Sequence, residues 1–507
     1  MTLYASSYYE TPEKTIKFNS PTVKTVYGDI RGIYQDGVHK YYGIPFAKPP
    51  LNELRFAPPQ DAEPWSGVLD CVKKKPSALQ VPDKSNTSYS EDCLYLNVWT
   101  PRTAKEGNNL PVLVYIHGGG FAMGSHNAET YNGIRFARDG VIQVNLPYRL
   151  NAFGFTAFEE IESKYGYLGN MAILDQIKGL KWVQDNIKAF GGNPKNVTLC
   201  GESAGSMCIA NMLLSKDAEG LFHRVIMESG TCLAQQVVSS RASGNKYQAI
   251  SNTRKLMNIV NAESVEDMEK IDGTELVDNS IFSFDMTKQT PQYFFPIFDG
   301  KLVPERPYDA LIDGKVHPID ILVGFNADEG SIFIPSDTTV EDYENYMFEA
   351  FGDDAEKVKK RFPVDSENSI VNRLRYMVKL CLAGTTQVYA DVLSDKGQNA
   401  YMYEFAYATD RMKQLGLGTY HGFELNFVFD TLAPSLKNFV SERIKNDVHQ
   451  RWLNFIVNGN PNIGGEFEMP WPQYFSDEKQ VLRFNENNSI ETSPFGEDLE
   501  FLWEILW

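Results

Sequence analysis

Residues 171–214 predict a helix, a strand, a tight turn and a second helix, in that order. Apolar residues recur at spacings of three and four in the first segment, as on one face of a helix: Ile173, Ile177, Leu180, Val183, Ile187 and Phe190. Glycines and a proline at 191–194 end this helix, and an apolar strand follows at Val197–Cys200. The turn GESAG at 201–205 leads into a further helical pattern. This alternation is typical of a parallel sheet covered by helices.

Further short apolar runs end in glycine or polar residues, as buried parallel strands do: VLVYIHGGG, VIQVNLPYR, RVIMESG and DILVGFNADEG. We find no internal repeat and no linker in the sequence. We therefore expect one α/β domain over residues 1–507, with a large, mostly parallel central sheet flanked by helices. Residues 340–395 predict an irregular helical insertion. It is either a wall over the carboxyl edge of the sheet or plain helical packing.

Charge and composition exclude several classes of function. A net charge of −18 argues against nucleic acid and against docking on anionic lipid. No apolar run reaches the ~18 residues that span a bilayer, and the N-terminal residues do not resemble a signal peptide. The six cysteines are scattered without a CxxC pair. We expect buried thiols, a reducing compartment and a cytoplasmic location.

The turn Gly201–Gly205 fits the pattern G-x-S-x-G. A serine nucleophile needs a tight strand-to-helix turn with small flanking residues, so that its hydroxyl is exposed. The helix that follows directs its N–H groups toward developing negative charge. An ordinary tight turn is the alternative, but the strand before it and the helix after it favour Ser203 as a nucleophile.

A glycine-rich loop, His117–Phe121, follows the predicted strand Val112–Ile116. Consecutive glycines let backbone N–H groups approach an oxyanion, together with the N–H after the nucleophile, here that of Ala204. The neighbouring residues fit neither phosphate-binding pattern, G-x-G-x-x-G or G-x-x-x-x-G-K-[ST]. A glycine-rich hairpin without this role is the alternative.

In a nucleophile-elbow fold the chain order is serine, acid, histidine. The histidines after Ser203 are His223, His317, His421 and His449. His421 follows a predicted strand at 401–407 and the loop QLGLGTYHG, where a general base belongs. His449 lies in a polar helix and is expected to be exposed. We therefore predict His421 as the base.

The acid is expected between the serine and the histidine. Asp328 and Glu329 both follow the predicted strand of VGFNADEG, and spacing alone leaves the choice open. The carboxylate would hold the imidazole tautomer and stabilise the imidazolium. The alternative is that both are solvated loop carboxylates. No H-E-x-x-H pattern or Cys/His cluster is present in the sequence, so we expect neither metal nor cofactor.

Taken together, these motifs resemble type-B carboxylesterases, of the carboxylesterase/cholinesterase family. The resemblance rests on blocks along nearly the whole chain: GDIRGIYQDGVHKYYGIPFAKPPLNELRFAPPQ, SEDCLYLNVWTP, VLVYIHGGGFAMGS, GNMAILDQIKGLKWVQDNIKAFGGNPKNVTLCGESAG, PIFDG, NADEG, YHGFELNFVF and WLNFIVNGNPN. It implies an α/β-hydrolase fold with helical insertions over the active site. It also implies hydrolysis of carboxylic esters to acid and alcohol through an acyl-enzyme.

The resemblance also implies roles for single residues. Ser203 would be the nucleophile, His421 the base and Glu329, rather than Asp328, the acid. Oxyanion donors would be the N–H groups of Gly119, Gly120 and Ala204. Glu202 is typical of the family at this position; it would tune the histidine or have only a supporting role.

Two departures from the family pattern bear on the cellular compartment and on cholinesterase activity. Secreted members usually pair the cysteine of SEDCLYLN, here Cys93, with an earlier cysteine, but Ala78 stands at that place and Cys71 is offset. The loss fits a reducing compartment. Residues 79–92 contain no tryptophan, so the aromatic platform for a quaternary ammonium is missing there and cholinesterase activity is not expected.

An aromatic content of 13% suits a hydrophobic gorge for small, apolar or aromatic ester substrates. Phe121 and Phe294 are candidate pocket walls, with core packing as the alternative for each. Three rival functions stay open: a non-catalytic binding protein on the same scaffold, a lipase or specialised esterase, and acyl transfer to an alcohol instead of water.

Overall fold

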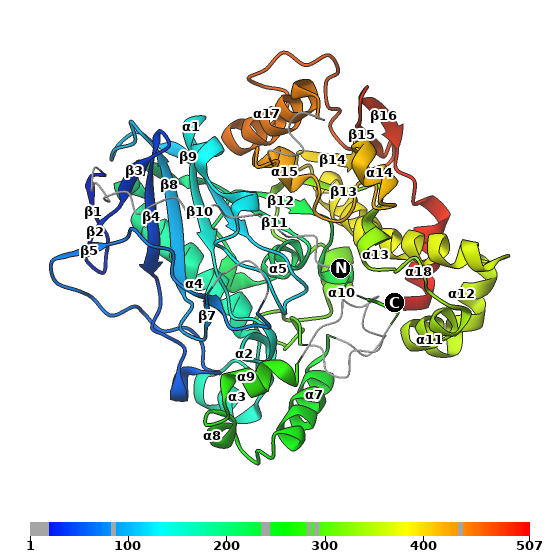
Figure 1. Ribbon diagram of the computed structural model, residues 1–507, viewed down its shortest axis with the longest axis horizontal. Helices are drawn as coiled ribbons and strands as arrows, with labels where there is room; N and C mark the ends of the chain where they lie inside the picture. Colours follow the sequence, from blue (N-terminus) through cyan, green and yellow to red (C-terminus); the bar gives the residue numbers. More distant parts are fainter. Residues whose placement is uncertain are drawn as a thin grey trace.

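An eleven-stranded sheet passes through the whole molecule (Figure 1). The computed structural model describes residues 20–82, 88–234, 244–280, 285–287, 294–433 and 440–506. The central strands pair in parallel, and the strands at both edges of the sheet pair antiparallel. In order across the sheet they are β16 (Ser489–Thr492), β15 (Gln480–Phe484), β14 (Ala400–Phe405), β13 (Asp320–Asn326), β12 (Arg224–Glu228), β11 (Gly192–Glu202), β9 (Leu110–Ile116), β10 (Ile142–Leu146), β8 (Tyr95–Pro101), β4 (Val38–Pro45) and β3 (Ile33–Gln35). The predicted large, mostly parallel sheet is confirmed.

Side chains of the central strands alternate between two cores. In β9, Val112 and Val114 belong to one hydrophobic cluster, whereas Leu113 and Tyr115 belong to another. Because successive side chains of a strand point to opposite faces, each face must be covered. The first core includes residues of α4 (Met171–Asn186), α5 (Ala204–Met212) and α13 (Glu367–Asp395), and the second includes residues of α15 (Leu425–Val428) and α17 (Glu442–Asn458).

The helix predicted over residues 171–190 is confirmed. It consists of α4 and a last turn of 3₁₀ helix, η3 (Ile187–Phe190). Gly191 then takes a left-handed conformation with φ of 93° and ends the element, as glycine commonly does after a helix. The chain can thus turn into β11, which carries the predicted nucleophile at its carboxyl end.

Shorter elements surround this framework. Further helices among the described residues are α1 (Ile134–Arg138), α2 (Asn151–Phe155), α3 (Glu159–Tyr165), α7 (Lys246–Ile259), α8 (Val265–Met268), α9 (Gly273–Asp278), α10 (Pro307–Ile312), α14 (Asp410–Gln414) and α18 (Gly496–Leu506). Two small sheets are formed by β1 (Thr22–Lys24), β2 (Asp29–Arg31) and β5 (Val68–Asp70), and by β6 (Ser77–Ala78) and β7 (Tyr89–Ser90).

The segment 340–395 is helical, as predicted. It contains α11 (Val340–Phe351), α12 (Ala355–Arg361) and α13. Helix α13 packs against β13 and against the 3₁₀ turn η5 (Glu329–Ile332), and the Arg375 guanidinium donates to the carbonyl oxygen of Ile334 at 3.1 Å. This helix therefore supports the turn that carries Glu329. A role of the whole segment as a wall over the site stays a prediction.

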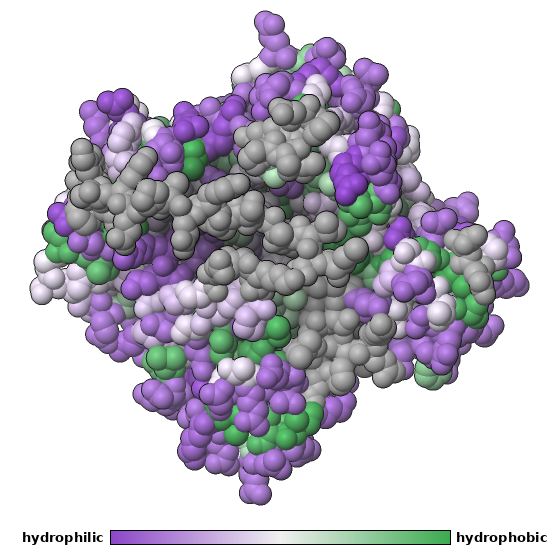
Figure 2. All heavy atoms as spheres, viewed as in Figure 1, coloured by the Kyte–Doolittle hydropathy of each residue, from purple (hydrophilic) through white to green (hydrophobic). Residues whose placement is uncertain are grey.

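The face of the molecule in Figure 2 is mainly hydrophilic, with hydrophobic side chains in separate groups, as expected for a net charge of −18. Among the helices that the structure describes, none has the length and apolarity needed to cross a bilayer.

Candidate active site

Ser203 lies on the sharp turn between β11 and α5. Its φ of 55° and ψ of −123° are strained for a residue with a side chain. Its N–H donates to the carbonyl oxygen of Glu228 at 2.8 Å, which ties the turn to β12. A methyl group at Gly201 would lie 2.7 Å from the carbonyl carbon of Gly205, and one at Gly205 would overlap the carbonyl oxygen of Ile116. Close backbone packing therefore explains both glycines of the motif.

The glycine loop lies directly against this turn. A methyl group at Gly118 would lie 2.5 Å from Glu202 Oε2 and 3.0 Å from Ser203 Cβ. Gly119 and Gly120 both have positive φ, 114° and 61°, which suits glycine. Ala204 is the first residue of α5, so the helix's own hydrogen-bond ladder does not use its N–H. The structure thus places Gly118, just before the two predicted loop donors, and Ala204 beside Ser203. That Gly119, Gly120 and Ala204 bind an oxyanion stays a prediction.

His421 and Glu329 are in direct contact. The ring Nδ1 lies 2.5 Å from Glu329 Oε2, while Glu329 Oε1 accepts the N–H of Asn326 at 2.7 Å. Glu329 is fully buried, and the edge of Phe333 packs against the His421 ring at 5.0 Å. Within the described chain His421 Nε2 is buried without a hydrogen bond. Glu329 thus holds one ring nitrogen of His421 and leaves the other without a hydrogen bond.

Asp328 has a different environment from Glu329. Its side chain is exposed, and Oδ2 accepts the N–H of Thr419 at 2.8 Å and the Thr419 hydroxyl at 3.1 Å. It thereby holds the loop that ends in His421. The structure brings Glu329, and not Asp328, to the imidazole. The sequence carries no signal for the contact between Asp328 and Thr419, because it joins loops 91 residues apart.

Glu202 faces the other ring nitrogen. Its Oε1 lies 3.1 Å from His421 Nε2, although the two atoms form no hydrogen bond. Burial raises the pKa of Glu202 to about 7, against the pull of the His421 charge. Burial lowers the pKa of His421, but the carboxylates of Glu202 and Glu329 and the hydrogen bond to Glu329 outweigh it and raise that pKa to about 9.

Two further buried glutamates lie beneath the site, and the sequence reasoning missed both. Glu228 Oε1 accepts the indole N–H of Trp452 at 2.9 Å, and the amide of Asn326 donates to Glu424. Burial raises the pKa of both carboxyls. The charge of Glu202 adds to the rise at Glu228, and the charge of Glu228 adds to the rise at Glu424. Glu228 ends an apolar strand, a place where a buried carboxyl gives no periodic signal.

The remaining candidate histidines lie elsewhere. His223 accepts the N–H of Val197 at 3.4 Å beside the start of β12, and His317 is half-buried before β13. The expectation of an exposed His449 is wrong: it is 1% exposed, with its ring nitrogens 2.6 Å from the Val428 carbonyl oxygen and 2.9 Å from Asp139 Oδ2. His449 lies on the inner face of α17. The many charged residues of that helix make this buried face hard to recognise in the sequence.

Both predicted pocket phenylalanines are buried. Phe121 is 1% exposed and its ring meets the Phe155 ring edge-on at 5.3 Å. Phe294 is 4% exposed and belongs to the main hydrophobic core. Contact of either ring with a substrate stays a prediction.

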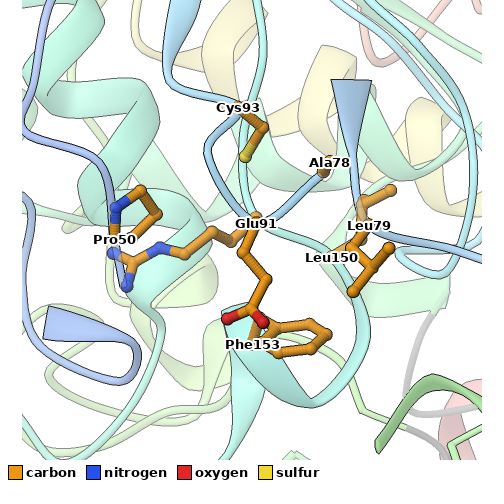
Figure 3. A pocket seen from close by; sticks show the side chains of 8 residues that line it. Pro50, Ala78, Leu79, Glu91, Cys93, Leu150 and Phe153 are labelled. Atoms are coloured by element: carbon orange, nitrogen blue, oxygen red, sulfur yellow. The ribbon is translucent and has the colours of Figure 1, made fainter. Parts of the chain in front are cut away.

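Ala78 and Cys93 line the same small cavity, with a volume of about 10 Å³ (Figure 3). Pro50, Leu79 and Phe153 contribute apolar walls. Cys93 is fully buried and unpaired, and the other five cysteines, all within the described residues, are also buried and unpaired.

The described residues contain no group of three His, Cys, Asp or Glu side chains that could hold a metal ion. The expectation that no metal takes part stays a prediction.

A mostly parallel sheet with a strained serine between a strand and a helix is the hallmark of the α/β-hydrolase fold. The chain matches the model of the carboxylesterase family over residues 19–502. It is 34% identical to the para-nitrobenzyl esterase of Bacillus subtilis (strain 168) over 503 residues, which cover 95% of this chain and 98% of the relative. It is 33% identical to carboxylesterase 1C of Rattus norvegicus, covering 96% and 93% of the two chains.

Solved structures agree. A PNB esterase aligns with a TM-score of 0.80 at 31% identity over 96% of this chain and 99% of that one. A thermophilic PNB esterase aligns with a TM-score of 0.81 over 95% and 99%. The chain therefore belongs to the carboxylesterase family, and it is a carboxylic-ester hydrolase.

Proposed function

We propose that the protein hydrolyses esters through an acyl-enzyme on Ser203, with His421 as general base and Glu329 as the acid that orients it. The observation that carries this proposal is the 2.5 Å contact between Glu329 and His421 Nδ1, made while Nε2 is left without a hydrogen bond. A hydrogen bond from Ser203 to a general base is often long before substrate binds. The strained turn at Ser203 adds support, because strain of this kind gathers at active sites.

In the proposed reaction, Ser203 Oγ attacks the ester carbonyl carbon while its proton passes to His421 Nε2. The carbonyl oxygen becomes an anion, which accepts the N–H groups of Gly119, Gly120 and Ala204. The C–O bond to the alcohol then breaks, and His421 returns the proton to the leaving alkoxide. Water repeats these steps on the acyl-enzyme and releases the acid.

Aromatic rings behind the glycine loop and the buried thiols support proposals for the substrate and the location. We propose small apolar or aromatic esters, since the glycine loop is backed by the buried rings of Phe121 and Phe155. Six unpaired, buried thiols support a reducing, cytoplasmic location. We also propose that residues 1–507 act as one catalytic domain, because the residues of the proposed site come from segments between 118 and 421.

The decisive experiment compares wild type with Ser203→Ala on p-nitrophenyl esters of increasing acyl length. We expect wild-type hydrolysis and a loss of about a thousandfold or more in the variant. The acyl length with the highest kcat/KM then defines the substrate class. Equal rates in the two proteins would remove Ser203 from the mechanism. No turnover by either would point to an ester substrate that the panel does not contain.

A further inference from the structure

A buried amide outside the proposed triad is bound to the glycine loop. Gln80 is 4% exposed, and its Nε2 donates to the carbonyl oxygen of Gly124 at 2.8 Å. Its Oε1 accepts the N–H of the same glycine at 2.9 Å, and Nε2 also donates to the Ala78 carbonyl oxygen at 3.0 Å. Hydrogen bonds to both the N–H and the carbonyl oxygen of one residue fix the position and the orientation of its backbone.

Gly124 is packed against the beginning of the loop. A methyl group at Gly124 would overlap the carbonyl oxygen of Gly118, and one at Gly119 would overlap that of Met123. The Met123 N–H also donates to the Gly119 carbonyl oxygen at 3.1 Å. The loop is thus folded back on itself, so a shift of Gly124 moves Gly118 and Gly119 with it.

Other side chains hold the remaining parts of the loop. The Ser77 and Ser125 hydroxyls lie 2.5 Å apart, next to the Gln80 contact. Asn151 holds the opposite limb: its side-chain amide donates to Ala122 O at 3.0 Å, and its N–H donates to Phe121 O at 2.8 Å. The hydrogen bonds of the Gln80 side chain reach Gly124, which packs against Gly118, the residue before the proposed oxyanion donor Gly119.

We propose that Gln80 is a positioning residue for the oxyanion hole. By holding Gly124, its amide sets where the N–H groups of Gly119 and Gly120 lie relative to Ser203. The inference rests on the proposed function, because it needs an oxyanion at this loop. Oxyanion donors act at 2.7–3.1 Å from the anion, and a displacement of about 1 Å costs about a hundredfold in rate. The structure thus assigns a catalytic effect to a residue that touches no substrate.

The test replaces Gln80 by a residue of similar volume without its hydrogen bonds, Gln80→Met. We expect kcat to fall about 10- to 100-fold with KM within about twofold of wild type, because the oxyanion exists only in the transition state. Gln80→Glu keeps an acceptor for the Gly124 N–H but lacks the donor to its carbonyl oxygen. It should also lose kcat, and it serves as a second variant if Gln80→Met does not fold.

A trifluoromethyl ketone separates positioning from plain stability. Ser203 adds to such a ketone to give a tetrahedral adduct whose oxygen is an anion, so its affinity should fall by the factor by which kcat/KM falls. The matched control is Gln184→Met in α4, whose amide also donates to two backbone carbonyl oxygens, Pro194 at 3.0 Å and Leu221 at 2.8 Å. We expect this control to keep wild-type kcat and ketone affinity.

Wild-type kcat and ketone affinity in both Gln80 variants would overturn the inference, and so would a change confined to KM. Equal losses in the Gln80 and Gln184 variants would also overturn it, because they would show a general loss of structure. The Ser203→Ala variant is assayed alongside. If it were as active as wild type, the proposed function itself would fail, whatever the Gln80 variants do.

Discussion

At the scale of single residues, the charge around His421 governs how the site responds to pH. Glu329 contacts Nδ1 and Glu202 lies 3.1 Å from Nε2, so two carboxylates face one imidazole. Their charges raise the pKa of His421 to about 9 in spite of its burial. A general base works in its neutral form, so kcat/KM must rise with pH through the pKa of this group.

We predict that Glu202→Gln moves the acid limb of the kcat/KM profile to lower pH. Removing one nearby carboxylate removes a cause of the raised pKa, and His421 then becomes neutral at a lower pH. The wild-type limb should lie above about pH 6.5, the value for an unperturbed histidine. The measurement is kcat/KM for a p-nitrophenyl ester from about pH 5 to about pH 10. Superimposable profiles for the two proteins would contradict the prediction.

The two neighbouring carboxylates at 328 and 329 should differ sharply in effect. Glu329→Gln replaces the group that stabilises the imidazolium, so we expect kcat to fall about a thousandfold or more. Asp328→Asn keeps an oxygen that can accept from Thr419, so its loss should stay below about tenfold. Both variants are assayed on one ester, with Tm as the check on folding. A greater loss at Asp328 would reverse the assignment.

Sequence reasoning could identify the elbow and His421, because each has a local signature. Spacing alone could not choose between Asp328 and Glu329, since both stand at the same strand end, and only the family resemblance implied Glu329. The choice depends on the 3₁₀ turn η5, which begins at Glu329 and aims its side chain inward, while Asp328 stays exposed. The burial of His449 also depends on a tertiary contact: α17 packs against α15, and the ring lies 2.6 Å from the Val428 carbonyl oxygen.

At the scale of elements, the site depends on how closely α5 approaches β9. Gly205 faces the carbonyl oxygen of Ile116 so closely that a methyl group would overlap it. This contact places the first turn of α5 beside the glycine loop that follows β9. The pattern G-x-S-x-G predicts small residues here, but the partner strand becomes known only from the sheet order.

We predict that Gly205→Ala lowers the free energy of unfolding by about 1–3 kcal/mol, since the added methyl forces the backbone apart. It should also reduce kcat, because the shift displaces Ala204. The control is Gly220→Ala, where φ is 77° but a methyl group would meet nothing within 4 Å. This control should lower the free energy of unfolding by about 1 kcal/mol through backbone strain alone, and its kcat should equal that of wild type. Denaturant unfolding measures both variants, and equal kcat in the two would contradict the role of the contact.

At the scale of the whole molecule, the fold holds together without a disulfide among the described residues. The parallel sheet has a hydrophobic core on each face, and all six cysteine side chains are buried. Where the resemblance implies a cystine in secreted relatives, Ala78 and Cys93 border a small cavity (Figure 3). Stability must therefore come from packing of the sheet and helices, because no disulfide among the described residues restricts the unfolded chain.

We predict that the native protein leaves its thiols unreactive and that unfolding exposes all six. Burial raises the pKa of Cys71 to about 12 and also raises the pKa values of the other five thiols. A reagent therefore cannot reach the sulfur atoms, and few of them are in the reactive thiolate form. A thiol reagent such as Ellman's should react negligibly before denaturation and with six groups in guanidinium without reductant. Tm should be the same with and without dithiothreitol. Fewer than six groups, or a Tm lowered by reductant, would reveal a stabilising disulfide and would count against the proposed reducing compartment, since such a bond persists only where thiols are oxidised.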